Sequence, residues 1–133
     1  MFVRVTVLHK HEESHQPMGV FQAACRLRDR GRMNPADELR HDEILRWFNL
    51  HLPIPGRFSR SHRRHAACKA ICWFRKQAVD HIGMVRNLAT LLERHGLATR
   101  TVHTAKPGYV VYEDDHQVVA IPFRDTIAPR VSD

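Results

Sequence analysis

The stretch GRFSRSHRRHAACK, residues 56–69, concentrates side chains that can bind an anion. It holds five basic residues and no carboxylate. A local field of this kind attracts phosphate and releases counterions, and an aromatic ring within it can stack on a base. A solvated loop on a basic protein would show the same charge. We expect the anion-binding surface to include two further cations that follow the stretch, Arg75 and Lys76. The expected surface then consists of Arg57, Phe58, Arg60, Arg63, Arg64, Lys69, Arg75 and Lys76.

The same stretch carries side chains that can bind zinc. Histidine and cysteine are common zinc ligands, and His62, His65 and Cys68 follow one another with two residues between each. This spacing lacks the longer arm that separates the ligand pairs of most four-ligand sites. The adjacent Arg63 and Arg64 would also repel a cation. The pattern therefore favours an anion over a metal.

A second group of possible metal ligands lies near the N-terminus, where His9, His11 and His15 flank two glutamates. Imidazole and carboxylate groups suit a transition metal. A polar turn in a chain with eleven histidines explains the pattern equally well, since short motif matches are often accidental. We expect no bound metal and no cofactor.

Acidic residues and a histidine gather in YEDDHQ, which contains Glu113, Asp114, Asp115 and His116. Neighbouring carboxylates raise each other's pKa and can bind Mg²⁺ or act as a general base. Beside a cationic loop they would suit a small metal-dependent nuclease. Aspartate is also a common turn residue, and the sequence has no glycine-rich phosphate loop, nucleophile elbow or HExxH motif. A non-catalytic protein is therefore favoured, with the nuclease as an alternative.

The net charge of +7 comes from one part of the chain. No acid lies between Glu43 and Asp80, an interval with eight basic residues. The other 13 basic and 14 acidic residues give a balance of −1. A surplus confined to one segment indicates an acidic partner, either nucleic acid, which is the first expectation, or an acidic protein. No helix-turn-helix, zinc finger or RNA-binding aromatic motif accompanies it.

The length and the cysteines limit the class of protein. The 133 residues suit one domain, expected over residues 1–126, with a tail at 127–133. No run of about 20 apolar residues could span a membrane. Three cysteines without a secretion signal favour a reducing compartment, and hence the cytoplasm.

The elements that must position these side chains follow from hydrophobic periodicity. Residues 2–8 alternate as a half-buried strand, and three segments repeat at helical spacing. Residues 53–69 form a long basic loop, and residues 98–104 are β-prone but thinly apolar, as in an edge strand. The expected order is β-α-α-β-α-β-β-β, an α+β domain with three helices packed on a small, mostly antiparallel sheet. The helices are expected at 17–30, 35–52 and 76–95, and further strands at 70–74 and 98–104.

Residues 109–123 are expected to form the last β-hairpin. With Asp114 and Asp115 as turn residues, Val111 would face Val118 and Val110 would face Val119. These pairs point to opposite faces, so both faces are apolar and need a cover.

Besides the nuclease alternative, the sequence of this small, basic protein, expected to be intracellular, suggests two non-catalytic functions. The first is a non-catalytic binding module that contacts nucleic acid through residues 57–69. The second is a homodimeric protein-interaction module, in which a second copy of the chain covers one face of the 109–123 hairpin.

Overall fold

One antiparallel sheet organises the chain, for which a computed structural model describes residues 1–10, 17–52, 70–123 and 130–132. Its hydrogen-bonded order is β5-β6-β3-β1-β4-β7, and β2 pairs with β1 off this path. With the helices, this gives the predicted α+β class. The strands are β1 (Phe2–Lys10), β2 (Pro17–Gly19), β3 (Ile71–Arg75), β4 (Thr99–Thr104), β5 (Tyr109–Glu113), β6 (Gln117–Ile121) and β7 (Arg130–Ser132).

The helices begin and end at the residues that favour helix termini. The side chain of Asn34 accepts a hydrogen bond of 2.8 Å from the backbone N–H of Asp37, which caps the second helix. Gly31 and Gly96 follow helices with φ of 66° and 84°, a backbone conformation that favours glycine. None of the helices in the described residues is long and apolar enough to cross a bilayer. The helices of the described residues are α1 (Val20–Asp29), α2 (Pro35–His51) and α4 (Val79–Arg94).

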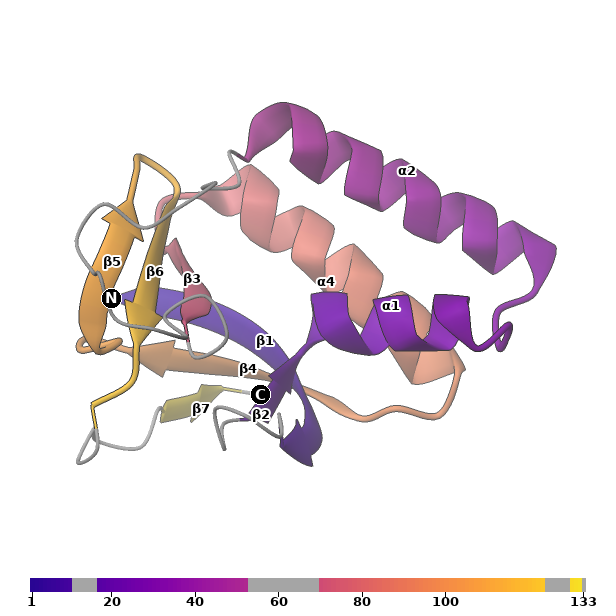
Figure 1. The fold of residues 1–133 in the computed structure, drawn as a ribbon, viewed down its shortest axis with the longest axis horizontal. Coiled ribbons are helices and arrows are strands. Elements are labelled where there is room, and N and C mark those ends of the chain that lie inside the picture. Colours follow the sequence, from indigo (N-terminus) through magenta and orange to yellow (C-terminus); the bar gives the residue numbers. More distant parts are fainter. Residues whose placement is uncertain (11–16, 53–69, 124–129, 133) are drawn as a thin grey trace.

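The main core lies between the helices and one face of β1. Val3, Val5 and Val7 alternate along β1, as the sequence predicts, and are only 3%, 4% and 1% exposed. They pack with buried residues of all three helices, among them Ile44 and Leu88. Figure 1 shows the helices gathered on one side of the sheet.

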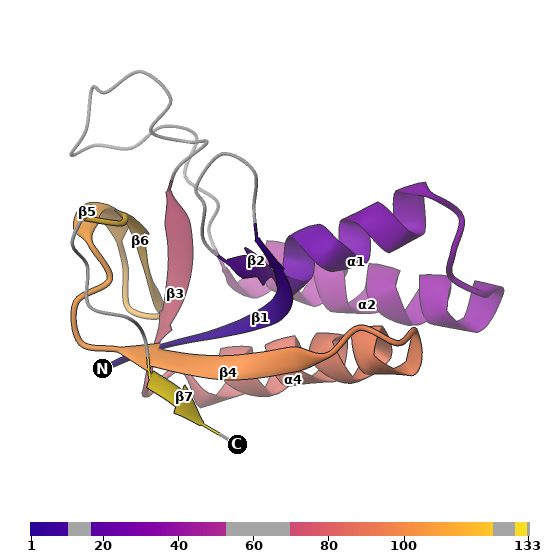
Figure 2. The ribbon, with the colours of Figure 1, turned by 90° about the horizontal axis from the view of Figure 1, so that it is seen from below.

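The opposite face of the sheet is covered by the sheet itself. Trp73 of β3, Val102 of β4 and Val118 of β6 are buried against one another. Figure 2 shows the bend that allows this, with β5 and β6 turned away from the direction of β1 and β4. Val119 and Ile121 form a cluster on the other face of β6. Both apolar faces of β6 are therefore covered within one chain.

Strand β1 lies at the centre of the sheet. Both β3 and β4 pair antiparallel with it, so β3 and β4 run parallel to each other on either side of β1, with α4 connecting them. The segment from β3 through α4 to β4 is thus a parallel crossover with one strand, β1, between its two members. Strand β4 also pairs with β7, so it is not a sheet edge. Residues 130–132, predicted as part of a tail, form this additional strand, a long-range pairing that local periodicity does not reveal.

The register predicted for the last hairpin is wrong. Glu113 pairs with Val118 and Tyr112 with Val119, while a bulge at Val111 shifts the remaining pairs by one residue. The turn lies one residue later than predicted, because the backbone N–H of Asp114 donates to the carbonyl of Gln117.

Candidate functional site

The basic segment, residues 57–69, lies outside the described residues. Six of the predicted anion-binding residues belong to it: Arg57, Phe58, Arg60, Arg63, Arg64 and Lys69. The described chain stops before the segment at Leu52 and resumes after it at Ala70. Of the described residues nearest the segment, Leu52 lines one pocket and Ala70 lines another.

The two remaining members of the predicted surface, Arg75 and Lys76, have different environments. Nη2 of Arg75 lies 3.0 Å from Oε2 of Glu113, and its Nε donates a hydrogen bond of 2.8 Å to the carbonyl of Asp114. Its guanidinium also lies 5.8 Å from the centre of the Phe2 ring. Arg75 therefore ties β3 to the hairpin tip, whereas Lys76 is exposed to solvent.

The metal ligands suggested by the sequence lie mostly outside the described residues: His11, His15, His62, His65 and Cys68. For His9 the structure gives only the backbone, within β1. Where side chains are described, no three histidine, cysteine, aspartate or glutamate residues gather as metal ligands would.

Asp114 organises the hairpin tip. One carboxylate oxygen accepts hydrogen bonds from the backbone N–H groups of His116 and Gln117, at 2.9 and 3.1 Å. The other accepts from the Tyr112 hydroxyl and the Gln117 side chain, at 3.0 and 2.9 Å. Burial alone would raise the pKa of Asp114, but these hydrogen bonds outweigh it and hold the pKa below its usual value. Its carboxylate is thus committed to the turn.

The histidine of the tip joins an aromatic cluster. The ring of His116 stacks on that of His81 at 4.4 Å. Nε2 of the buried His81 lies 2.9 Å from the carbonyl oxygen of His51, the last residue of α2. Trp47 packs edge-on against His81 and stacks on His51. The cluster joins the hairpin to the two long helices.

A pocket of about 410 Å³ lies beside this cluster and is called the tip pocket below. It brings together three of the four predicted catalytic residues, while Glu113 faces Arg75 instead. Asp115 is exposed, and the C-terminal end of α2 adds the negative end of a helix dipole. The tip pocket is lined by Asn49, Leu50, His51, Leu52, Asp114, Asp115 and His116.

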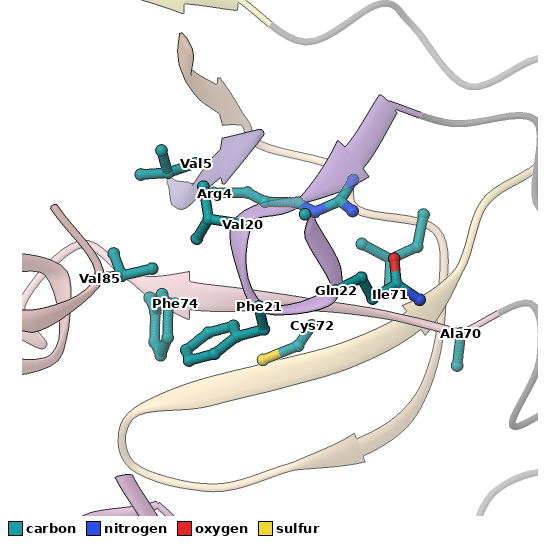
Figure 3. A pocket seen from close by; sticks show the side chains of 11 residues that line it. Arg4, Val5, Val20, Phe21, Gln22, Ala70, Ile71, Cys72, Phe74 and Val85 are labelled. Carbon is teal, nitrogen blue, oxygen red and sulfur yellow. The ribbon is translucent and has the colours of Figure 1, made fainter. Parts of the chain in front are cut away.

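A second pocket, of about 200 Å³, lies where two strands diverge from β1. Strand β4 pairs with β1 from Phe2 to Val7, which leaves the other edge of β1 for β3 and β2. On that edge β3 pairs only as far as Val3, and β2 begins at Thr6. The hollow between them is called the fork pocket below and is drawn in Figure 3. Its walls are Arg4, Val5, Gly19, Val20, Phe21, Gln22, Ala70, Ile71, Cys72, Phe74 and Val85.

Among the described residues that line the fork pocket, Arg4 is the only charged one. Its guanidinium reaches the start of α1, where Nη2 lies 3.2 Å from the position of a Cβ built on Gly19. Burial lowers the pKa of Arg4 to about 10, and the group remains a cation at neutral pH. No carboxylate of the described residues pairs with it. A partly buried positive charge therefore lacks an internal counter-charge within the described part of the chain.

The first turn of α1 adds hydrogen-bond donors to the same pocket. Gly19 to Gln22 are the N-cap and first three residues of the helix, whose backbone N–H groups have no partner within the helix. Gly19 provides no side-chain cap, and the first turn contains no acid. In α2, by contrast, Asn34 caps the helix and Asp37 and Glu38 follow. Within the described residues, the start of α1 therefore has neither a side-chain cap nor an acid that would neutralise the positive end of its dipole.

Neither Arg4 nor the fork pocket was predicted from the sequence. A signal does exist in the sequence, because the first turn of α1 has neither a capping side chain nor an acid. The proximity of Arg4 to this turn has no local signal, since it depends on the divergence of β2 and β3.

Cys72, at the far wall of the fork pocket, is an inert thiol. Its Sγ donates a hydrogen bond of 3.2 Å to Oε1 of Gln117. Burial raises the pKa of Cys72 to about 12, although the nearby Arg4 opposes this shift. The thiol is therefore protonated at neutral pH and is neither a nucleophile nor a ready metal ligand.

The chain was compared with known protein families, curated proteins and solved structures, and no match was found.

Proposed function

We propose that this protein is a non-catalytic binding module that holds a polyanion, with nucleic acid as the first candidate, through the basic segment of residues 57–69. The observation that carries the proposal is the position of the charge. The interval between Glu43 and Asp80 has eight cations and no acid, whereas the rest of the chain is close to neutral. Arg75 uses its guanidinium within the fold, so the contacts are assigned to the segment and to Lys76.

The environment of the carboxylates supports this proposal. A basic segment cannot attract phosphate if carboxylates of the same protein neutralise it. Several acidic side chains already have partners elsewhere in the fold, such as Asp37 with Arg94 and Glu38 with Arg28. Within the described residues, such carboxylates belong to Asp37, Glu38, Asp42, Glu43, Glu93, Glu113 and Asp114.

A salt titration of oligonucleotide binding tests the proposal. Each phosphate contact adds about 0.7 to the slope of log affinity against log salt for a single strand. Replacing Arg57, Arg60, Arg63 and Arg64 with glutamine should therefore reduce the slope by about 3 and weaken binding at low salt. The control replaces four exposed arginines outside the segment with glutamine, which removes the same charge: Arg30, Arg32, Arg86 and Arg100. This control should keep most of the slope.

Equal slopes for the two quadruple variants would show that net charge, and not the segment, causes binding. The alternatives give different results. A homodimer that uses residues 109–123 would persist at high salt without binding nucleic acid. A nuclease would cleave RNA or DNA in a chelator-sensitive manner and would lose this activity in Asp115→Asn.

A further inference from the structure

The fork pocket has the properties of a site for one phosphate group. The guanidinium of Arg4 supplies a forked set of donors, and the open first turn of α1 supplies backbone N–H groups and the positive end of a helix dipole. The described residues offer no carboxylate to either group in the pocket lining. The donors come from two segments, β1 and α1, and suit an anion with several acceptor oxygens.

The size and the walls of the pocket restrict the ligand further. A volume of about 200 Å³ is below the roughly 300–1,000 Å³ of pockets for whole drug-sized ligands, so a single group fits better than a complete nucleotide. Apart from Arg4 and Gln22, the walls are largely apolar, with Val20, Phe21 and Phe74 among them. Apolar walls lower the local dielectric constant and strengthen the attraction between Arg4 and an anion.

We propose that the fork pocket binds a phosphate monoester group or free phosphate through Arg4 and the first-turn backbone N–H groups of α1. The pocket lies next to Ala70, where the described chain resumes after the basic segment. A nucleic acid held by the segment could therefore place its terminal phosphate here. This nucleic-acid arm rests on the proposed function, whereas the binding of free phosphate does not.

The variant Gly19→Asp provides the test, because it should fill the pocket with the protein's own anion. Gly19 has an extended backbone, with φ of −72° and ψ of 157°, which aspartate adopts without strain. An added Cβ meets only the flexible end of Arg4. The carboxylate would cap α1 and pair with Arg4, so the variant should unfold at a higher temperature than the wild type. Lost binding would then not result from lost folding.

The first measurement is the unfolding temperature of the full chain with inorganic phosphate, compared with chloride at equal ionic strength. Phosphate should raise it in a saturable manner in the wild type, and should have little effect on Gly19→Asp or on Arg4→Met. Gly19→Asn is the matched control, because it caps the helix without adding charge and should keep part of the response. An absent response in the wild type, or an unchanged response in Gly19→Asp, would overturn the inference.

The second measurement compares 5′-phosphorylated and 5′-hydroxyl oligonucleotides of one sequence. The 5′-phosphate should tighten binding to the wild type several-fold and leave binding to Gly19→Asp unchanged. A response to inorganic phosphate without this preference would support the pocket and assign it to a free anion or small phosphoester. If the hydroxyl oligonucleotide binds with the expected salt slope but phosphate has no effect in either assay, the pocket fails and the proposed function stands.

Discussion

Arg4 is a cation for which the described fold provides no counter-charge. Burial lowers its pKa to about 10, which means that the folded protein disfavours the charged form and holds this charge at a cost in free energy. An apolar side chain of similar length would avoid the cost. Such a cost is expected for a residue that binds a ligand, because the ligand then supplies the counter-charge.

Asp114 has the opposite relation to its surroundings, because the fold supplies all the partners of its carboxylate. We predict that Asp114→Asn lowers the free energy of unfolding by about 1–3 kcal/mol at pH 7, the usual range for hydrogen bonds to a charged group. An amide replaces one acceptor oxygen with a donor, which would face the Gln117 side chain. Chemical denaturation of both proteins measures the difference.

The pH dependence of this difference follows from the lowered pKa of Asp114. The stabilising effect of the carboxylate is complete above its unfolded pKa of about 4, and it is lost as the pH falls through the lower pKa of the folded state. The two proteins should therefore become more similar in stability below about pH 4. A difference that stays constant to pH 2 would show that the charge of Asp114 does not stabilise the turn.

At the scale of elements, α2 and α4 are joined at opposite ends by different chemistry. At the start of α2, the buried Asp37 pairs with Arg94 and lies 2.8 Å from Nε2 of His95, both at the end of α4. At the other end of α2, His81 of α4 contacts the carbonyl oxygen of His51. Each contact places a charged or polar group where a helix terminus favours it.

We predict that Asp37→Ala destabilises the protein by about 3 kcal/mol, because the change leaves Arg94 and His95 without their buried partner. Glu43→Ala is the matched control. Glu43 pairs with Arg40 at the surface, where such pairs contribute less than about 1 kcal/mol. Thermal or urea denaturation of the two variants gives the comparison. Equal losses would show that burial does not distinguish the two ion pairs.

The elements themselves could be predicted because their signals are local. The helix predicted at 35–52 corresponds to α2, and the alternation predicted at 2–8 corresponds to β1 with its buried valines. The predicted hairpin register failed because the hydrogen bonds of Asp114 and the bulge at Val111 decide it, and neither follows from apolar alternation. The fork pocket could not be predicted for a similar reason: it depends on where β2 and β3 pair along β1.

At the scale of the whole molecule, the curled sheet changes the argument for a second copy of the chain. The sequence required a cover for both apolar faces of the hairpin. On one face Val118 clusters with Trp73 and Val102, on the other Val119 and Ile121 cluster with Val111, and all five residues of β6 are buried. The exposed large apolar side chains near this sheet edge are Tyr109 and Phe123, at 44% and 49% exposure. Burial of β6 thus no longer requires a partner.

We therefore predict that the purified protein is a monomer in light scattering at both low and high salt, and that nucleic acid co-purifies with it at low salt. The basic segment should retain nucleic acid by charge, so a high-salt wash should remove it and lower the ratio of absorbance at 260 nm to that at 280 nm. A salt-resistant dimer without nucleic acid would instead favour the interaction module.

Stoichiometric zinc in elemental analysis would favour a metal site formed by histidines outside the described residues, because the described side chains do not gather as metal ligands.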